Sequence, residues 1–187
     1  SHYNYLKYLI IGCWFFLIFS IYFFREPKRV PIGGENEMVS PADGKIVQIV
    51  EIDHPEIGKS IQISIFLSVF NVHSQWVPIS GKVLNSEYNK GKFLAAFNDK
   101  ASLDNEQTSV LFQSYSGERY IVKQIAGLIA RRILNYMNVG DEVFKGQRLG
   151  FIRFGSRVDI IVPPNFKIFV SLGDKVSANT TIIGKFI

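Results

Sequence analysis

An uncharged apolar run near the N-terminus constrains this chain more than any other feature of its sequence. Residues 8–24 form a stretch of 17 residues without a charged side chain, between Lys7 and Arg25. A helix of that length rises about 25 Å, slightly less than the ~30 Å hydrocarbon core of a bilayer. The run ends in Phe-Phe-Arg-Glu-Pro rather than in the small residues of a signal-peptide cleavage site. We therefore predict a membrane-anchoring helix within residues 1–26, and a buried core helix is the alternative.

The charges around this run predict its orientation. Three basic residues follow it and one precedes it, so the positive-inside bias places the rest of the chain on the cytoplasmic side of the cell membrane. The net charge is +5, with −4 over residues 31–120 and +6 over residues 121–187. Such a charge suits nucleic acid, anionic lipid or a small anion equally well. Together with the anchor it favours a lipid partner, and we expect no nucleic acid.

The rest of the chain is typical of one β-rich domain. Pro27, Pro31 and Gly33-Gly34 indicate a linker over residues 27–37, which leaves residues 38–187 as the globular domain. Short β-branched segments bounded by turn residues predict strands at 45–52, 60–67, 82–84, 109–113, 119–124, 157–162 and 167–170. Apolar spacing predicts short helical structure at 92–97 and one substantial helix at 125–137. The expected fold class is mainly β, of α+β type, a sandwich or barrel with one substantial helix behind the N-terminal anchor.

A turn sequence occurs twice. Residues 139–146 (VGDEVFKG) return as residues 172–179 (LGDKVSAN), and related turns lie at 42–46 and 79–83. Glycine supplies positive φ in such a turn, and aspartate bonds to nearby backbone. The repeat resembles the half-motifs of lipoyl and biotinyl-type β-sandwiches. A carrier function is disfavoured because neither methionine, Met38 or Met137, adjoins a lysine.

Few residues offer chemistry. The three histidines are His2, His54 and His73, and no closely spaced set of metal ligands accompanies them, so we expect no catalytic metal. The single cysteine excludes an internal disulfide and a cysteine-rich zinc site. Gly155-Ser156 is either an ordinary β-turn or a self-processing bond. Glycine leaves the scissile carbonyl unhindered, and a serine hydroxyl that attacks it can end as a pyruvoyl group.

Eight segments in order carry a resemblance to a known family. From about residue 23 to residue 186, the chain resembles the short, membrane-associated phosphatidylserine decarboxylases of bacteria and archaea. The last of the eight segments contains the run Phe-Gly-Ser-Arg-Val-Asp. The matching segments are 41–44, 66–73, 78–83, 89–97, 99–102, 104–107, 124–133 and 152–162. The resemblance implies a proenzyme that cleaves itself between Gly155 and Ser156. Its products would be chains 1–155 and 156–187, held together as a heterodimer, the smaller beginning with a pyruvoyl group (covalent pyruvate) made from Ser156.

The resemblance also implies roles for individual residues. The amine of phosphatidylserine would form a Schiff base with the pyruvoyl carbonyl, lose CO₂ and leave as phosphatidylethanolamine. His73 would be the general acid or base, since an unperturbed histidine pKa of about 6.5 suits that work. Asp43 would assist self-cleavage, and a turn-capping aspartate is the alternative. Longer members carry a second histidine and short members an Asn-Arg pair where this chain has Gln75-Trp76. Self-cleavage through a triad with Asp43 and Ser156 must therefore use His73 itself, or proceed without a histidine.

Three further residues are candidates for substrate contact. Trp76 is expected to pack against acyl chains, and Arg153 and Arg157 are expected to attract the anionic headgroup, with ordinary solvated charge as the alternative. We also expect a homo-oligomer. Two other functions stay open: an archaetidylserine decarboxylase that uses the same chemistry on an ether lipid, and a non-catalytic, membrane-anchored biotinyl-like adaptor in which Gly155-Ser156 is an intact turn.

Overall fold

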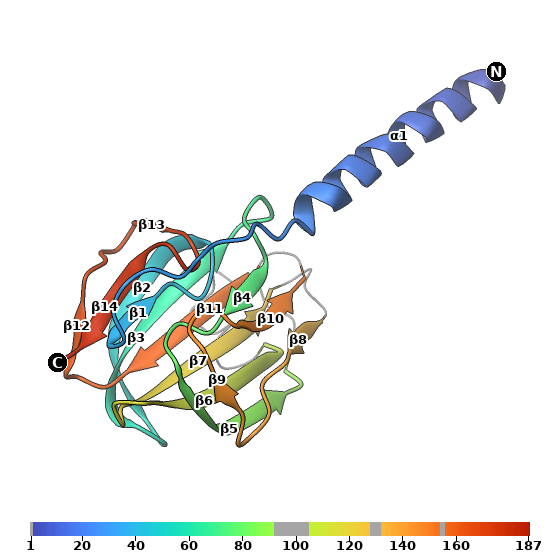
Figure 1. The fold of residues 1–187 in the computed structure, drawn as a ribbon. Coiled ribbons are helices and arrows are strands. Elements are labelled where there is room, and N and C mark those ends of the chain that lie inside the picture. The colour runs from blue at the N-terminus through green and yellow to red at the C-terminus, as the bar shows by residue number, and fades with distance from the viewer. Residues whose placement is uncertain (1, 92–104, 128–131, 154–155) are drawn as a thin grey trace.

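One helix and a set of antiparallel strands make up the described part of the chain, residues 2–91, 105–127, 132–153 and 156–187 of a computed structural model. Figure 1 shows helix α1 (His2–Phe23) projecting from a β-rich body. The strands are β1 (Glu37–Val39), β2 (Gly44–His54), β3 (Gly58–Leu67), β4 (Ser74–Trp76), β5 (Gly81–Asn89), β6 (Gln107–Ser114), β7 (Arg119–Ala126), β8 (Ile133–Asn135), β9 (Glu142–Val143), β10 (Arg148–Ile152), β11 (Ser156–Val162), β12 (Phe166–Ile168), β13 (Lys175–Val176) and β14 (Ile182–Phe186). The prediction of a β-rich fold behind an N-terminal helix is confirmed.

Helix α1 presents apolar side chains to its surroundings on all sides. The segment Tyr5–Phe23 is long and apolar enough to cross a membrane, and only 6% of its most apolar window is buried in the protein. A core helix would bury these side chains, so that alternative does not fit. Phe23, at the last turn, is the exception because it is fully buried against the β-rich body.

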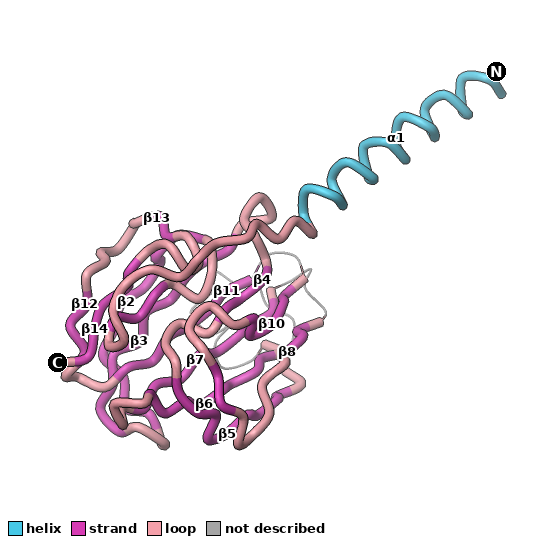
Figure 2. Tube along the Cα trace, viewed as in Figure 1, coloured by secondary structure: helices cyan, strands magenta, loops and turns pink. Residues whose placement is uncertain are grey.

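A curled eight-stranded sheet forms most of that body (Figure 2). Its strand order is β13-β2-β3-β11-β7-β6-β5-β9, and two three-stranded sheets, β1-β14-β12 and β4-β10-β8, accompany it. Side chains from one face of the large sheet, among them Ile63, Val122 and Val158, form the main hydrophobic core with apolar residues of the smaller sheets. Strand β11 lies between β3 and β7, near the middle of the large sheet.

The repeated turn sequence forms two equivalent structures. Gly140 and Gly173 both have positive φ, 93° and 95°. The N–H of Gly140 donates to the carbonyl of Val83 at 2.9 Å, and the N–H of Gly173 donates to that of Ile46 at 2.8 Å. Each copy contains a two-residue strand, β9 paired with β5 and β13 paired with β2, and these two strands are the two ends of the strand order. The expected turn geometry is therefore present.

The segment between α1 and β1 is docked on both copies of this turn. Gly146 and Asn179 occupy the last position of the two copies and have φ of 81° and 65°. A Cβ on Gly146 would lie 2.8 Å from Cγ of Pro31, and the N–H of Ile32 donates to the carbonyl of Asn179 at 3.1 Å. The expected linker thus runs along the domain and makes contacts with it.

The predicted helix over residues 125–137 is wrong at both ends. Ile125 and Ala126 belong to β7, and Ile133–Asn135 is β8, while residues 128–131 lie outside the described part. Strand β7 is buried on both faces, so its side chains do not alternate and its apolar positions imitate helical spacing. The helical segment expected at 92–97 also lies outside the described residues. Six of the seven predicted strands fall within strands of the structure, and the seventh, 167–170, extends two residues beyond the end of β12 at Ile168.

Candidate functional site

Ser156 is the first residue of β11, and it lies at one end of the large sheet. It pairs with Leu67 of β3 and with Ala126 of β7. The side chain is fully buried, and its Oγ has no hydrogen-bond partner among the described residues. A buried hydroxyl without a partner costs about 1–3 kcal/mol, so such a group calls for an explanation. Gly155, the other half of the candidate cleavage site, lies outside the described residues.

Strand register brings Asp43 to the same end of the sheet. Lys45 of β2 and Arg157 of β11 both pair with Phe66 of β3, so the residues before them lie level with each other. Asp43 immediately precedes β2. Two strand spacings separate β2 from β11, about 10 Å in all. The sheet therefore places Asp43 and Ser156 near one another in space although they are far apart in sequence.

His73 also lies beyond this end of the sheet. The chain leaves β3 at Leu67 and enters β4 at Ser74, with His73 immediately before that strand. The N–H of Ile152 donates to the carbonyl of His73 at 3.2 Å. Ile152 is the last residue of β10 and precedes the Gly155-Ser156 pair by a few residues. The three residues that the resemblance assigns to catalysis therefore gather around one sheet end.

The imidazole of His73 is buried, and its hydrogen bonding determines which ring nitrogen carries the proton. Its Nδ1 lies 3.0 Å from the carbonyl oxygen of Asn71, and a carbonyl can only accept, so Nδ1 carries the proton and Nε2 presents a lone pair. Nε2 has no partner within the described chain. Burial lowers the pKa of His73 to about 4, although the Asn71 bond opposes the shift. The expectation of an ordinary histidine pKa is therefore wrong, and at neutral pH the ring is an acceptor.

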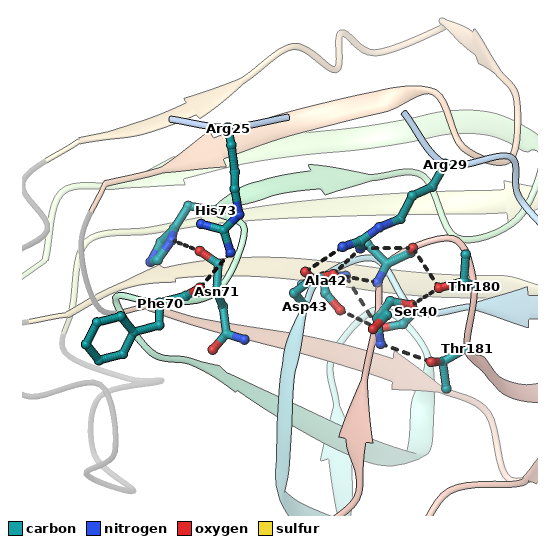
Figure 3. A network of polar contacts seen from close by, with 12 residues as sticks. Arg25, Arg29, Ser40, Ala42, Asp43, Phe70, Asn71, His73, Thr180 and Thr181 are labelled. Carbon is teal, nitrogen blue, oxygen red and sulfur yellow. Dashed lines mark hydrogen bonds and ion pairs between the residues drawn. The ribbon is translucent and has the colours of Figure 1, made fainter. Parts of the chain in front are cut away.

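Asp43 is held by partners other than His73. Both of its carboxylate oxygens accept hydrogen bonds from Arg29, one of them at 3.0 Å, and one also accepts from the N–H of Ala178 at 2.8 Å. The bond to Asp43 raises the pKa of Arg29. Figure 3 shows two separate networks, Asp43 with Arg29 in one and His73 with Asn71 in the other. No hydrogen bond between Asp43 and His73 is present in this described region.

The bond from Ala178 to Asp43 has a counterpart in the other half of the domain. There the N–H of Lys145 donates to Oγ of Ser80 at 2.9 Å. Ser80 precedes Gly81 as Asp43 precedes Gly44, and Lys145 and Ala178 hold the same position in the two copies of the repeated turn. One oxygen of Asp43 therefore serves the repeat structurally, in agreement with the turn-capping alternative.

Two buried glutamines support the His73 segment. The side-chain amide of Gln75 donates to the carbonyl of His73 at 2.6 Å, and that of Gln124 donates to Oε1 of Gln75 at 2.8 Å. They connect the His73 backbone to β7, the neighbour of β11. In the sequence, Gln75 stood out only because this residue departs from the family pattern. Gln124 begins the matching segment 124–133, but nothing in the sequence pointed to a role for its side chain.

The expected position of Trp76 at the lipid interface is wrong. Its side chain is buried and packs with Val72 and Ala178, so it holds the segment before and within β4 against the second copy of the repeated turn. With 7% of its surface exposed, Trp76 has little area left for acyl chains.

The two candidate headgroup arginines differ in their surroundings. Arg157 is buried and donates to both oxygens of Asp159 at 2.6 and 3.0 Å and to Oε1 of Gln48 at 3.2 Å. Residues alternate along a strand, so Arg157 faces the side of the sheet opposite to Ser156. This placement contradicts a headgroup role. Arg153 is exposed, at the end of β10 near the candidate cleavage site.

Comparison with known proteins identifies the family of this chain. Residues 16–184 match the profile of the phosphatidylserine decarboxylase family. Three similar proteins are each named phosphatidylserine decarboxylase proenzyme. The one from Geotalea uraniireducens is 42% identical over 182 residues, which cover 96% of this chain and 85% of the relative. Those from Aromatoleum aromaticum and Burkholderia mallei are 45% and 46% identical, each over 92% of this chain and 80% of the relative. The chain therefore belongs to the phosphatidylserine decarboxylase family and is a decarboxylase.

Proposed function

We propose that this chain is the proenzyme of a membrane-bound phosphatidylserine decarboxylase that makes its own pyruvoyl group by cleavage between Gly155 and Ser156. The observation that carries the proposal is the hydroxyl of Ser156, buried at the start of β11 and without a partner within the described residues. A turn serine of the adaptor alternative would have its hydroxyl in water or bonded to nearby backbone. Enzyme-family membership also disfavours that alternative.

The proposed self-cleavage is a balanced sequence of steps on Ser156. Its Oγ attacks the carbonyl carbon of residue 155 and gives its proton to a base; the C–N bond then breaks, and the nitrogen of Ser156 takes up a proton. The resulting ester loses the α-proton of Ser156 as the bond to Oγ breaks, which releases residue 155 with a free carboxylate. Water hydrolyses the remaining enamine, by way of its imine, and ammonia leaves.

His73 is the proposed base for these self-cleavage steps. Its Nε2 carries a lone pair without a partner in the described chain, and its low pKa keeps the ring neutral at physiological pH. The bond from Nδ1 to Asn71 fixes which nitrogen accepts a proton. Asp43, already bonded to Arg29 and Ala178, would act on the reaction through its charge.

The same residues suit the decarboxylation step. A pyruvoyl group supplies a carbonyl for the substrate amine and an electron sink for the pair left by departing CO₂. Since its low pKa leaves Nε2 without a proton at neutral pH, His73 would accept one there from the substrate ammonium and pass it to the substrate carbon. The rings of Phe23 and Phe151, with centroids 4.4 and 6.5 Å from that of His73, would keep water from the imidazole and so limit competing proton transfer from solvent.

The anchor is proposed to deliver the lipid. With α1 in the bilayer and the basic residues after it on the cytoplasmic side, the domain would take phosphatidylserine directly from the membrane. Arg153, exposed near the site, is the headgroup contact we retain. A heterodimer of the two cleaved chains is proposed as the working unit, and association of such units into a homo-oligomer remains a prediction.

The first experiment measures the mass of the denatured protein, purified with Ser156 intact and as Ser156→Ala. We expect fragments 1–155 and 156–187 from the wild type, the smaller with a blocked N-terminus, and one intact chain from the variant. Ser64→Ala, a change at a buried serine on β3, is the matched control and should still be cleaved. A wild-type chain that stays intact after incubation with anionic lipid would overturn the proposal. If the wild type is cleaved, its decarboxylation of ester-linked and ether-linked serine lipid in vesicles would identify the preferred substrate.

A further inference from the structure

The last turn of α1 forms one wall of the His73 site. Phe23 is fully buried, and its ring centroid lies 4.4 Å from that of His73. Phe24 stacks on Phe151 of β10 with centroids 5.6 Å apart and an interplanar angle of 17°, and Phe151 lies 6.5 Å from His73. Within the described residues, Phe23 at the end of α1 thus contacts the imidazole directly, and Phe24, the next residue, packs on Phe151, the other phenylalanine in ring contact with His73.

Polar contacts fix this helix end to the loop that carries His73. The hydroxyl of Tyr22 donates to the carbonyl of Phe70 at 3.1 Å. Figure 3 shows Arg25, which donates to the same oxygen at 2.7 Å. The side chain of Arg25 also donates to the carbonyl of Tyr22 at 2.7 Å, at the helix C-terminus where a cation is favourable. Phe70 lies three residues before His73, so these bonds restrain the loop as well as the helix.

We infer that the last turn of the anchor helix, with Phe23 as its central contact, completes the His73 site and positions the imidazole. The anchor then takes part in the chemistry of the site as well as in membrane attachment. Phe23 is a positioning residue because it touches His73 and acts through it. The consequence for cleavage rests on the base role proposed for His73, whereas the contact itself does not.

The electrostatics of His73 agree with this geometry. Burial is the largest cause of its low pKa, and the ring of Phe23 packs against the imidazole. The charged groups that act on the ring are Arg25, which lowers the pKa, and Asp43, which raises it, while the carbonyl of Asn71 also raises it. Removal of the Phe23 ring should admit water beside the imidazole and return its pKa toward the ordinary value.

The test is a titration of His73 by NMR in the full-length, uncleavable Ser156→Ala chain in detergent micelles, with ¹³C-labelled histidine. Assignment uses His2→Asn and His54→Asn. The parent should titrate with a midpoint near pH 4, and Phe23→Ala should raise that midpoint by at least about one pH unit. Phe15→Ala, a change at an exposed residue on the same helix, is the matched control and should leave it unchanged.

A second variant keeps the test available if Phe23→Ala does not fold. Phe23→Leu retains apolar bulk but loses the ring, and should raise the midpoint by less. A midpoint that is unchanged in both Phe23 variants overturns the inference.

Cleavage with Ser156 intact separates this inference from the proposed function. The wild type should cleave at similar rates at pH 8 and pH 5.5, whereas Phe23→Ala should slow about tenfold at pH 5.5 if its His73 pKa reaches the ordinary value. A shifted titration without this loss would refute the base role of His73 and leave the anchor contact supported. An intact wild type would refute the proposed function, and the titration would still decide the inference.

Discussion

His73 differs most from what its residue type suggests. Histidine is usually chosen for proton transfer because its ordinary pKa lies near neutrality, but here the ring is buried beside Phe23 and its pKa is about 4. Such a ring accepts a proton from a neighbouring group instead of storing one. Ser156, buried and without a partner in the described structure, is the group whose proton the proposed mechanism removes.

The low pKa makes His73 a source of acid sensitivity. Its folded pKa lies below the unfolded value of about 6.5, so the unfolded chain binds the proton first as the pH falls. The destabilisation of the folded chain by His73 is absent above about pH 6.5 and grows as the pH falls toward 4. The free energy of unfolding of the Ser156→Ala chain should therefore fall by about 2 kcal/mol from pH 7.5 to pH 5 through this residue.

Guanidinium unfolding in detergent at the two pH values measures the loss. His73→Gln in the same background should reduce it, because glutamine does not titrate. His54→Gln is the control, since burial also lowers the pKa of His54 but that residue lies at the far end of β2. An equal loss with and without His73 would contradict the assignment.

At the scale of elements, the repeated turns explain how the segment after α1 becomes part of the domain. Strand segments were predictable because β-branched residues alternate between turn signals, and the Gly-Asp turns were predictable from their chemistry. The prediction of a helix over 125–137 was wrong, because β7 is buried on both faces and has no alternating pattern. No local signal showed that Pro31 and Ile32 would pack on the ends of both turns.

Two glycine substitutions test that docking. Gly146 and Gly140 both have positive φ, so alanine at either should cost about 1–2 kcal/mol. At Gly146 the new Cβ would also lie 2.8 Å from Pro31, whereas at Gly140 no atom lies within 4 Å of it. Gly146→Ala should therefore lower the melting temperature more than Gly140→Ala, and should expose residues 27–36 to protease. Equal melting temperatures and equal protection would show that the Pro31 contact does not hold this segment.

At the scale of the whole molecule, the proposed cleavage site lies where the products cannot easily separate. Chain 156–187 would contain β11, which pairs with β3 on one side and β7 on the other. It would also contain β13, which pairs with β2, and β14, which pairs with β1. Strands of the smaller chain are thus hydrogen-bonded to strands of the larger one.

The two cleaved chains should consequently remain together under native conditions. We expect them to co-elute in size-exclusion chromatography in detergent and to separate only in denaturant, because the backbone hydrogen bonds and core contacts of β11 would all have to break. The Ser156→Ala chain gives the elution volume of the intact proenzyme for comparison. Release of the smaller chain in native buffer would contradict this arrangement.

The sequence by itself determined the apolar N-terminal helix, most strand positions, the repeated turns and the family, because each of these depends on local pattern or on a specific run such as Phe-Gly-Ser-Arg-Val-Asp. Only the tertiary structure decided the state and partners of the site residues. Asp43 binds Arg29, Arg157 binds Asp159 on the opposite face, Trp76 is buried, and His73 lies against Phe23. Burial and charge pairing are set by strand register and by contacts between distant segments, and a pKa or an accessible surface exists only once those contacts are made.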